Sequence, residues 1–502
     1  MLSLRRNIAA NYASQVYVAL IGILMLPIYI KYMGAEAYGL IGFFTMMQAW
    51  FNLLDLGLTP TIGRETARYR AGFADVLSFR RLYRALSAIF ILIAMIGGTG
   101  LLVLSSTIAK DWLNTEELSL NEIQIAVQIM AISVALRWMC GLFRGVITGS
   151  ERLVWLGGFN AFVASLRFIG VLAVMWWFGF TPFVFFSYQL VIAIIEIAGL
   201  WLKSTYLILS QAPISEPIGW SLNPVRPLIK FSLTIAFTAS VWVMVTQTDK
   251  LILSSILPLS EYGFFTLSVL VANGIMLLSG PISNAIMPRL AKLEAEGNRK
   301  EVIQVYRQST RLVTVIAGSA AATLAFCAEP LLWAWTGDFA LARKSAPILT
   351  LYAIGNGALA VAAFPYYLQY ARGDLRLHFI GHLLLLLILI PSIVLAANFY
   401  GAIGAGYVWV VVNLLYLFVW VAIMHRKLEP GLHWKWLFND VLMIGLPIGV
   451  LGIVVLFVEL NLTSRLGSLV YVMAFGVIAA LLAAFMSSDI RNFISKLKAK
   501  VV

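Results

Sequence analysis

Apolar stretches of about 20 residues recur along the whole chain, and they constrain its fold more than any other feature. A run of about 18 or more apolar residues is long enough to cross a bilayer as a helix. The chain is 61% hydrophobic and 12% charged, whereas soluble domains average roughly 25% charged residues. Because the bilayer core offers no water to backbone groups, helices are the expected solution. The sequence therefore predicts an all-α polytopic membrane protein.

We count about fourteen windows that could span a membrane. They lie at residues 11–33, 38–60, 85–107, 122–147, 154–178, 182–204, 229–250, 262–287, 309–330, 345–370, 378–399, 402–424, 438–459 and 465–486. The first window follows a basic front, as in a signal peptide. Its apolar run exceeds the usual length of about 7–15 residues and no small-residue cleavage site follows, so we interpret it as an uncleaved span.

Basic residues are divided unequally between the two sets of connections. One set, taken with both termini, carries 27 of the 36 Lys and Arg residues, and the opposite set carries six. Because basic loops stay in the cytoplasm, we expect both termini to be cytoplasmic. The net charge of +13 then reflects this bias and attraction to anionic lipid headgroups, and it requires no nucleic-acid partner.

The two halves of the chain repeat one another at an offset of 224 residues. The matches pair Tyr38-Gly39 with Tyr262-Gly263, Gly149 with Gly373, and Arg152 with Arg376. The repeat predicts a six-helix lobe in residues 1–228 and a second in residues 229–425. Two additional helices and a basic tail follow in residues 426–502. Repeated halves around a substrate site near the midplane are typical of alternating-access transporters.

Five segments carry a family resemblance by their order and spacing. They are PIYIKYMGAEAYGLIGFF, LLDLGL, RETAR, LFRGVITGSERLVWL and FYGAIGAGYVWV. Together they resemble the Wzx-type polysaccharide flippases of the multidrug/oligosaccharidyl-lipid/polysaccharide (MOP) exporter superfamily. The resemblance implies a bacterial inner-membrane protein that moves a polyprenyl-diphosphate-linked oligosaccharide to the periplasmic leaflet. It also implies a polymerase and a chain-length regulator as pathway partners. O-antigen, capsule and exopolysaccharide units all remain open as the substrate.

Ionisable side chains deep in the membrane are functional candidates by default. Arg137, Arg144, Arg167 and Glu196 qualify, at depths that reach about 20 Å from the cytoplasmic ends of their helices. A guanidinium matches phosphate and carboxylate oxygens, so the three arginines predict a cationic cavity for the substrate. Trp138 would offer a flat face to a sugar ring, and Glu196 would be a counter-charge or a proton-sensitive partner. The alternative is an Arg–Glu ion pair that holds the helices together.

At the equivalent positions of the second half, the repeat has uncharged residues. The counterparts of Arg137, Arg167 and Glu196 are Val361, Pro391 and Trp420. Charge confined to the first lobe suits a substrate with one anionic headgroup.

Other polar residues are weaker candidates. Asp55, in LLDLGL, has either a coupling role or a polar role at a helix end. Asn11 and Gln15 lie one turn apart on the first span, and Asn273 lies on the eighth, so each could face a cavity. His378 and His382 also lie one turn apart, but no third ligand is evident, so no metal site is expected.

The energy source follows from what the sequence lacks. It has no Gly-Lys dipeptide and hence no P-loop. We expect no cofactor, and we expect coupling to a proton or sodium gradient or to consumption of the product. Glu196 favours protons. The alternatives are a cation-coupled multidrug antiporter, a lipid II flippase and a membrane-embedded enzyme such as a polymerase or acyltransferase.

Overall fold

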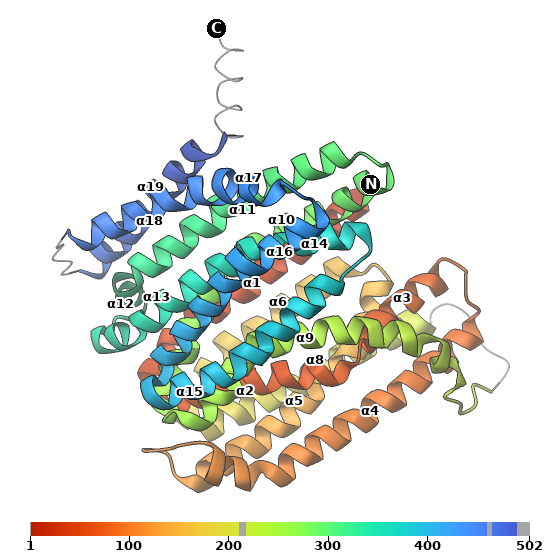
Figure 1. Ribbon diagram of the computed structural model, residues 1–502. Coiled ribbons are helices and arrows are strands. Elements are labelled where there is room, and N and C mark those ends of the chain that lie inside the picture. The colour runs from red at the N-terminus through yellow and green to blue at the C-terminus, as the bar shows by residue number, and fades with distance from the viewer. Residues whose placement is uncertain (1, 210–216, 459–463, 489–502) are drawn as a thin grey trace. The chain divides into compact units, whose positions relative to one another are not determined.

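A computed structural model describes residues 2–209, 217–458 and 464–488 (Figure 1). Within these ranges the chain is helical, and its strand-like pairing is limited to one isolated bridge between Asn114 and Pro258. The predicted all-α class is confirmed. The chain divides into two compact units, Met1–Gly263 and Phe264–Val502, and the division falls within the helix α10 (Leu259–Ala295).

The first unit contains the helices up to the start of α10. They are α1 (Leu2–Met33), α2 (Ala35–Phe51), η1 (Asn52–Asp55), α3 (Leu58–Arg70), α4 (Val76–Thr107), η2 (Ile108–Trp112), α5 (Leu120–Gly149), α6 (Leu153–Ser165), η3 (Leu166–Gly170), α7 (Val171–Phe178), α8 (Pro182–Leu209), η4 (Asn223–Leu228) and α9 (Ile229–Ile256).

The second unit contains most of α10 (Leu259–Ala295) and the helices after it. They are α11 (Arg299–Phe326), α12 (Ala328–Thr336), α13 (Phe339–Ala362), α14 (Phe364–Arg372), α15 (Arg376–Leu415), η5 (Tyr416–Trp420), α16 (Val421–Leu428), α17 (Leu432–Trp436), η6 (Leu437–Leu442), α18 (Met443–Leu456) and α19 (Arg465–Met486).

Eleven helices of the described chain are long and apolar enough to cross a membrane, or twelve if a bent pair around α9 is one span. This is near the predicted fourteen, and two differences have local causes. The span expected at residues 38–60 is interrupted, because α2 ends at Phe51 and continues only through η1. The spans expected at 378–399 and 402–424 form one helical run, Arg376–Leu428, with a non-helical break at Gly401 (φ 57°, ψ −141°).

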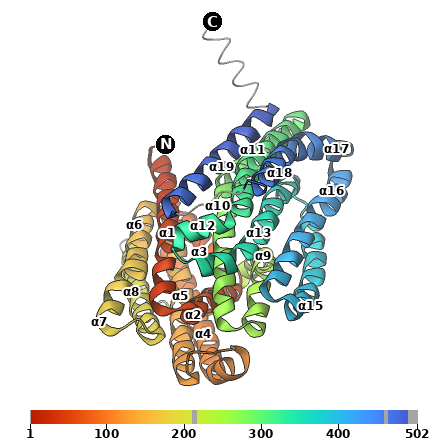
Figure 2. The ribbon, with the colours of Figure 1, turned by 90° about the vertical axis from the view of Figure 1, so that its left-hand side faces the viewer.

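Helix α5 is the most enclosed long helix of the first unit, with half of its apolar window buried. It packs against α3, α4 and α8, while α1 packs along α6 (Figure 2). Its first turn is fixed by a capping box, in which Ser119 and Glu122 each accept a backbone N–H from the other. Polar residues on α5 are therefore carried into the interior of the unit.

Backbones approach closely where α2 meets the start of α10. A Cβ atom added to Gly39 would lie 2.1 Å from the carbonyl oxygen of Leu259, and one added to Gly263 would lie 2.6 Å from that of Ala35. Both distances are shorter than real Cβ contacts allow. The Tyr-Gly pairs of the repeat are thus explained by packing, because no residue larger than glycine fits.

Helices α18 and α19, which follow the repeat, pack against α11. An apolar cluster that includes Val315, Ile444 and Phe475 joins α11, α18 and α19. Asp440 of η6 is fully buried, and its carboxylate accepts from Arg307 Nε at 2.6 Å and from Arg311 Nη1 at 2.7 Å. A buried ion-pair cluster therefore fixes these segments to α11.

Candidate functional site

Three helices of the first unit each present two polar residues seven positions apart. This spacing is about two helical turns, so both members of a pair lie near one face. The pairs are Arg137 and Arg144 on α5, Asn160 and Arg167 on α6–η3, and Gln189 and Glu196 on α8. Their contacts form two layers.

The first layer is built around Arg137, and we call it the Arg137 layer. Its guanidinium donates to Gln189 Oε1 (2.9 Å) and to Gln48 Oε1 (3.3 Å). The amide nitrogen of Gln189 donates to the backbone oxygen of Arg167 (3.0 Å). Residues from α2, α5, α8 and η3 therefore meet in this layer, and all the side-chain acceptors around Arg137 are neutral amides.

The second layer is built around Arg144, and we call it the Arg144 layer. Arg144 donates to Glu196 Oε1 at 2.5 Å and to Asn160 Oδ1 at 2.7 Å. Glu196 is 5% exposed. A buried carboxylate needs such a partner, because leaving its charge unpaired costs several kcal/mol. The ion pair expected as the structural alternative is thus present at Arg144, and not at Arg137 or Arg167.

Some charged groups in the two layers form no ion pair, and some of their atoms form no hydrogen bond. Among the described residues, no carboxylate lies within ion-pair distance of Arg137 or Arg167. The buried Nε atoms of both arginines, and Oε2 of Glu196, have no hydrogen-bond partner. Buried polar atoms are nearly always satisfied, so these three atoms set the two layers apart from an ordinary helix interface.

Arg167 lies in η3, a turn of π-helix between α6 and α7. A π-turn widens the helix and releases backbone oxygens from their usual partners, and such turns often occur at functional sites. Here two adjacent residues of α8 satisfy two of these oxygens. Tyr188 donates to the oxygen of Leu166 at 3.0 Å, and Gln189 donates to that of Arg167.

Two cavities of the first unit open beside the layers. The smaller, about 320 Å³, is lined by ten residues that include Gln15, Asn160, Arg167 and Glu196. The larger, about 450 Å³, is lined by residues of η1, α3, α5 and α9, including Asp55, Arg137 and Trp138. Arg144 lines both. The three predicted arginines therefore face cavities, with the carboxylates Glu196 and Asp55 in the walls.

Asp55 has a clear local role. The chain turns sharply after it, with Leu56 at φ 47° and Gly57 at φ 70°. Its carboxylate accepts from the backbone nitrogen of Thr59 at 3.2 Å and from the Thr59 hydroxyl at 2.5 Å. Asp55 thus anchors the start of α3 after the break in the second predicted span, and it also lines the larger cavity.

Trp138 is largely covered by other aromatic rings. It is 6% exposed, stacks on Phe90 at 4.7 Å between ring centroids and meets the edge of Phe51 at 6.0 Å. It borders the larger cavity, but its packing leaves little free face for a sugar ring.

The weaker candidates are divided between the units. Gln15 lines the smaller cavity, whereas Asn11 is partly buried on α1 and lines neither cavity. In the second unit, Asn273 accepts from Asn356 Nδ2 at 3.1 Å, and Asn356 in turn accepts from Trp409 at 3.0 Å. Asn273 therefore belongs to a bonded chain between α10, α13 and α15.

Sequence reasoning missed Gln48, Asn160 and Gln189. Uncharged amides do not stand out in apolar helices, although the seven-residue spacing from Arg167 and Glu196 could have identified two of them. Val361, the repeat counterpart of Arg137, is buried in the second unit. No group of three or more potential metal ligands occurs in the part of the chain that the structure describes.

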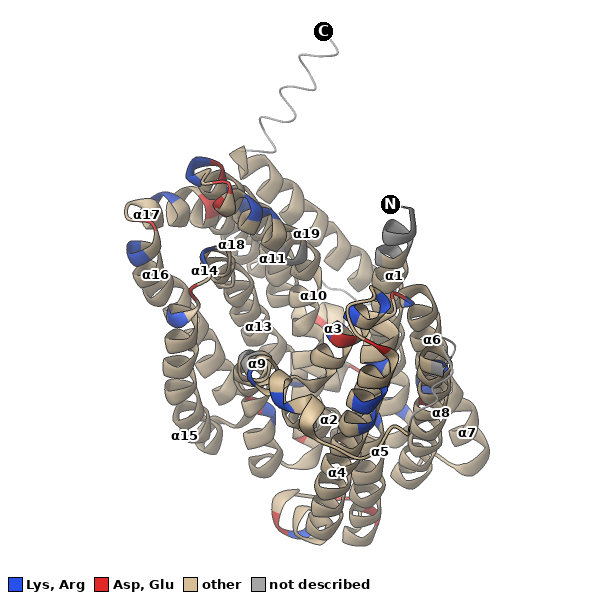
Figure 3. Ribbon diagram, turned by 90° about the vertical axis from the view of Figure 1, so that its right-hand side faces the viewer, with Lys and Arg blue, Asp and Glu red and all other residues tan. Residues whose placement is uncertain are grey.

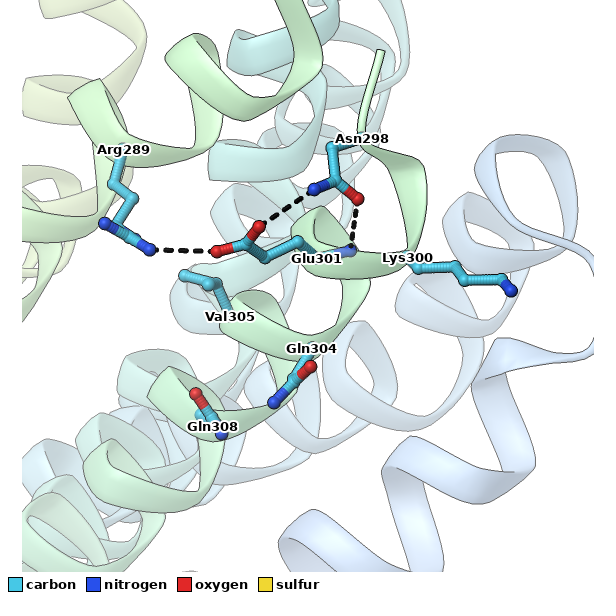
Figure 4. Close-up of a pocket in the computed structure, with 7 residues that line it drawn as sticks. All are labelled: Arg289, Asn298, Lys300, Glu301, Gln304, Val305 and Gln308. Carbon is cyan, nitrogen blue, oxygen red and sulfur yellow. Dashed lines mark hydrogen bonds and ion pairs between the residues drawn. The ribbon is translucent and has the colours of Figure 1, made fainter. Parts of the chain in front are cut away.

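A further pocket, of about 470 Å³, lies in the second unit at the turn between α10 and α11 (Figure 4). Glu301 accepts there from Arg289 at 3.0 Å and from Asn298 at 2.9 Å, while Lys300 points away. The Arg289 and Glu301 side chains are 60% and 39% exposed. We interpret it as a solvated surface with a satisfied ion pair.

Comparisons with known proteins place this chain in a family. The model of the polysaccharide biosynthesis protein family matches residues 4–294. The chain belongs to this family. A Shigella flexneri protein named "Putative O-antigen transporter" is 22% identical over 415 residues, which cover 81% of this chain and 94% of that protein.

Two solved structures of transporters have a similar fold. The lipid II flippase MurJ, in an inward closed conformation, has a TM-score of 0.73 at 13% identity and covers 96% of this chain and 99% of its own. An inward-facing multidrug resistance MATE transporter has a TM-score of 0.67 at 11% identity and covers 82% and 94%. The resemblance inferred from the motifs is confirmed. The protein is a multi-pass membrane transporter and not an enzyme.

Proposed function

We propose that this transporter is a flippase for a polyprenyl-diphosphate-linked oligosaccharide. The substrate would be an O-antigen, capsule or exopolysaccharide unit, moved from the cytoplasmic to the periplasmic leaflet of the bacterial inner membrane. The observation that carries the proposal is the pair of guanidiniums, Arg137 and Arg167, that face cavities and have no carboxylate within ion-pair distance among the described residues. The family and the named relative support the polysaccharide pathway.

A charged group that has no ion-pair partner in a low-dielectric interior has an unfavourable free energy. A cation in a low-dielectric interior is stabilised strongly only by an anion at short range. A diphosphate provides two phosphate groups for guanidinium forks. A transporter of cationic drugs would instead gain from unpaired carboxylates, so the charge pattern favours the flippase over the multidrug antiporter.

We further propose both termini in the cytoplasm and coupling to protons through Glu196. Basic residues on α3, α14 and α16 (Figure 3) lie on the segments assigned to the cytoplasmic side by the count of Lys and Arg. Protonation of Glu196 would release Arg144 and change the charge between the two cavities. Alternatively, net transport would be driven by a sodium gradient, or by removal of the product by a polymerase and chain-length regulator.

The test is a lipid profile of the native host. Deletion of the gene should cause one completed polyprenyl-diphosphate-linked repeat unit to accumulate, detected by mass spectrometry of extracted lipids, and a plasmid-borne copy should reverse it. The mass would identify the sugar. Accumulation of lipid II would support the second flippase class, and an unchanged profile with a new drug sensitivity would replace the proposal by the antiporter.

A further inference from the structure

The two layers use the same geometry with one chemical difference. Gln189 faces Arg137 and Glu196 faces Arg144, each at a sequence separation of 52 residues between α5 and α8. Each acceptor oxygen lies within hydrogen-bond distance of a guanidinium nitrogen. One layer therefore contains an Arg–amide pair where the other contains an Arg–carboxylate pair.

An amide holds an arginine without cancelling its charge. Gln48 and Gln189 bind different terminal nitrogens of Arg137, which fixes the plane of the guanidinium. A carboxylate at either position would form a stronger, charge-assisted bond and compete with any bound anion. The neutral acceptors thus leave Arg137 both oriented and positively charged.

Gln189 also connects Arg137 to the turn that carries Arg167. Its amide nitrogen donates to the Arg167 backbone oxygen, and its side chain has little freedom because the residue is 3% exposed. One amide group therefore sets the orientation of one cation and supports the backbone of the other. The buried Nε atoms of both arginines have no hydrogen-bond partner, so each guanidinium keeps one unused donor.

We propose that Gln189 is a positioning residue that keeps Arg137 oriented and uncompensated for the diphosphate of the substrate. This inference rests on the proposed function. Two carboxylates line the neighbouring cavities, Glu196, which is paired with Arg144, and Asp55, which accepts from Thr59. Neither forms an ion pair with Arg137.

The experiment exchanges the two acceptors. The full-length protein is reconstituted in nanodiscs as wild type, Gln189→Glu, Glu196→Gln, the double exchange Q189E/E196Q, and Gln189→Met. Binding of undecaprenyl diphosphate is measured by native mass spectrometry, with undecaprenyl monophosphate as the comparison, and a melting temperature is recorded for each.

Gln189→Glu should weaken diphosphate binding about tenfold or more, because the new carboxylate pairs with Arg137. Its melting temperature should stay close to that of wild type, because the new charge-assisted bond to Arg137 offsets the lost donation to the Arg167 backbone oxygen. The double exchange keeps the net charge and should remain defective, since the negative charge has only moved from Arg144 to Arg137. Gln189→Met removes both hydrogen bonds and should bind weakly, with a smaller preference for diphosphate over monophosphate.

Wild-type binding by the double exchange would overturn the inference, because net charge alone would then suffice. Equal binding by wild type and Gln189→Glu would also overturn it. So would a loss of binding in both Gln189 variants that is accompanied by a lower melting temperature, because unfolding would then explain the loss. If wild type does not bind undecaprenyl diphosphate, the proposed function itself fails and this inference fails with it.

Discussion

Arg137 and Arg144 lie two turns apart on α5, and they differ in partner rather than in position. The sequence identified both residues and Glu196, because charges in apolar helices are conspicuous. It did not indicate which arginine holds the carboxylate, since that depends on the register between α5 and α8. The neutral partners Gln48, Asn160 and Gln189 were missed for a related reason. Amides are less costly in a membrane helix than charges, so sequence alone gives them little weight.

Substitution of Arg137 or Arg167, which form no ion pair, should lower transport and leave the fold intact. We expect Arg137→Ala and Arg167→Ala to lower export at least about tenfold, because each removes a charge-assisted donor worth about 1.5–3 kcal/mol. Lys at either position should retain partial activity, as a point charge without the planar fork. Export of the surface polysaccharide is compared at matched protein level, with Arg343→Ala, an exposed residue in the first turns of α13, as the control. Full export by both Ala variants would make these charges dispensable.

The buried carboxylate of Asp440 should stabilise the folded second unit. Asp440→Ala leaves Arg307 and Arg311 without their buried partner, and we expect a loss of about 3–5 kcal/mol in the free energy of unfolding. Thermal unfolding in detergent measures the effect. The control, Glu296→Ala, removes the half-exposed partner of Lys292 and should change little. Equal melting temperatures for both variants would contradict the assigned role of Asp440.

At the scale of helices, periodicity and length predicted where apolar segments lie but not how they are interrupted. The sharp turn after Asp55, the break at Gly401 and the π-turn at η3 each depend on packing against another segment. The Tyr-Gly repeats were visible in the sequence as a match at constant offset. Their physical cause, a backbone contact between α2 and α10, required the tertiary structure.

The glycines of this contact should not tolerate a methyl group. We expect Gly39→Ala or Gly263→Ala to destabilise the protein by about 1–3 kcal/mol, the usual range for an overpacked site. The matched control is Gly274→Ala, on the same helix α10, where an added Cβ meets nothing within 4 Å. Melting temperature in detergent distinguishes them. A Gly274 variant that loses as much as the Gly263 variant would mean that helix flexibility, and not the close contact, is responsible.

For the whole molecule, composition was sufficient to predict a multi-pass helical membrane protein. The internal repeat predicted a transporter, and the order of motifs indicated the superfamily. The lobe boundary at residues 228–229 stays a prediction, because the compact units divide at Gly263 and packing need not follow a repeat. The identity of the sugar could not be read from the sequence. Sugars are recognised by hydrogen bonds whose donors come from several helices, and no short motif encodes that arrangement.

We propose that this protein moves a diphosphate-linked saccharide across a bilayer and that Arg137 and Arg167 are required for this movement. The most direct measurement reconstitutes the purified protein in proteoliposomes with a polyprenyl-diphosphate-linked saccharide and follows its exposure to an added glycosyltransferase. We predict time-dependent movement between leaflets with wild type and with Arg343→Ala, and none above empty liposomes with Arg137→Ala/Arg167→Ala. No movement with wild type, or equal movement with the double variant, would contradict the account.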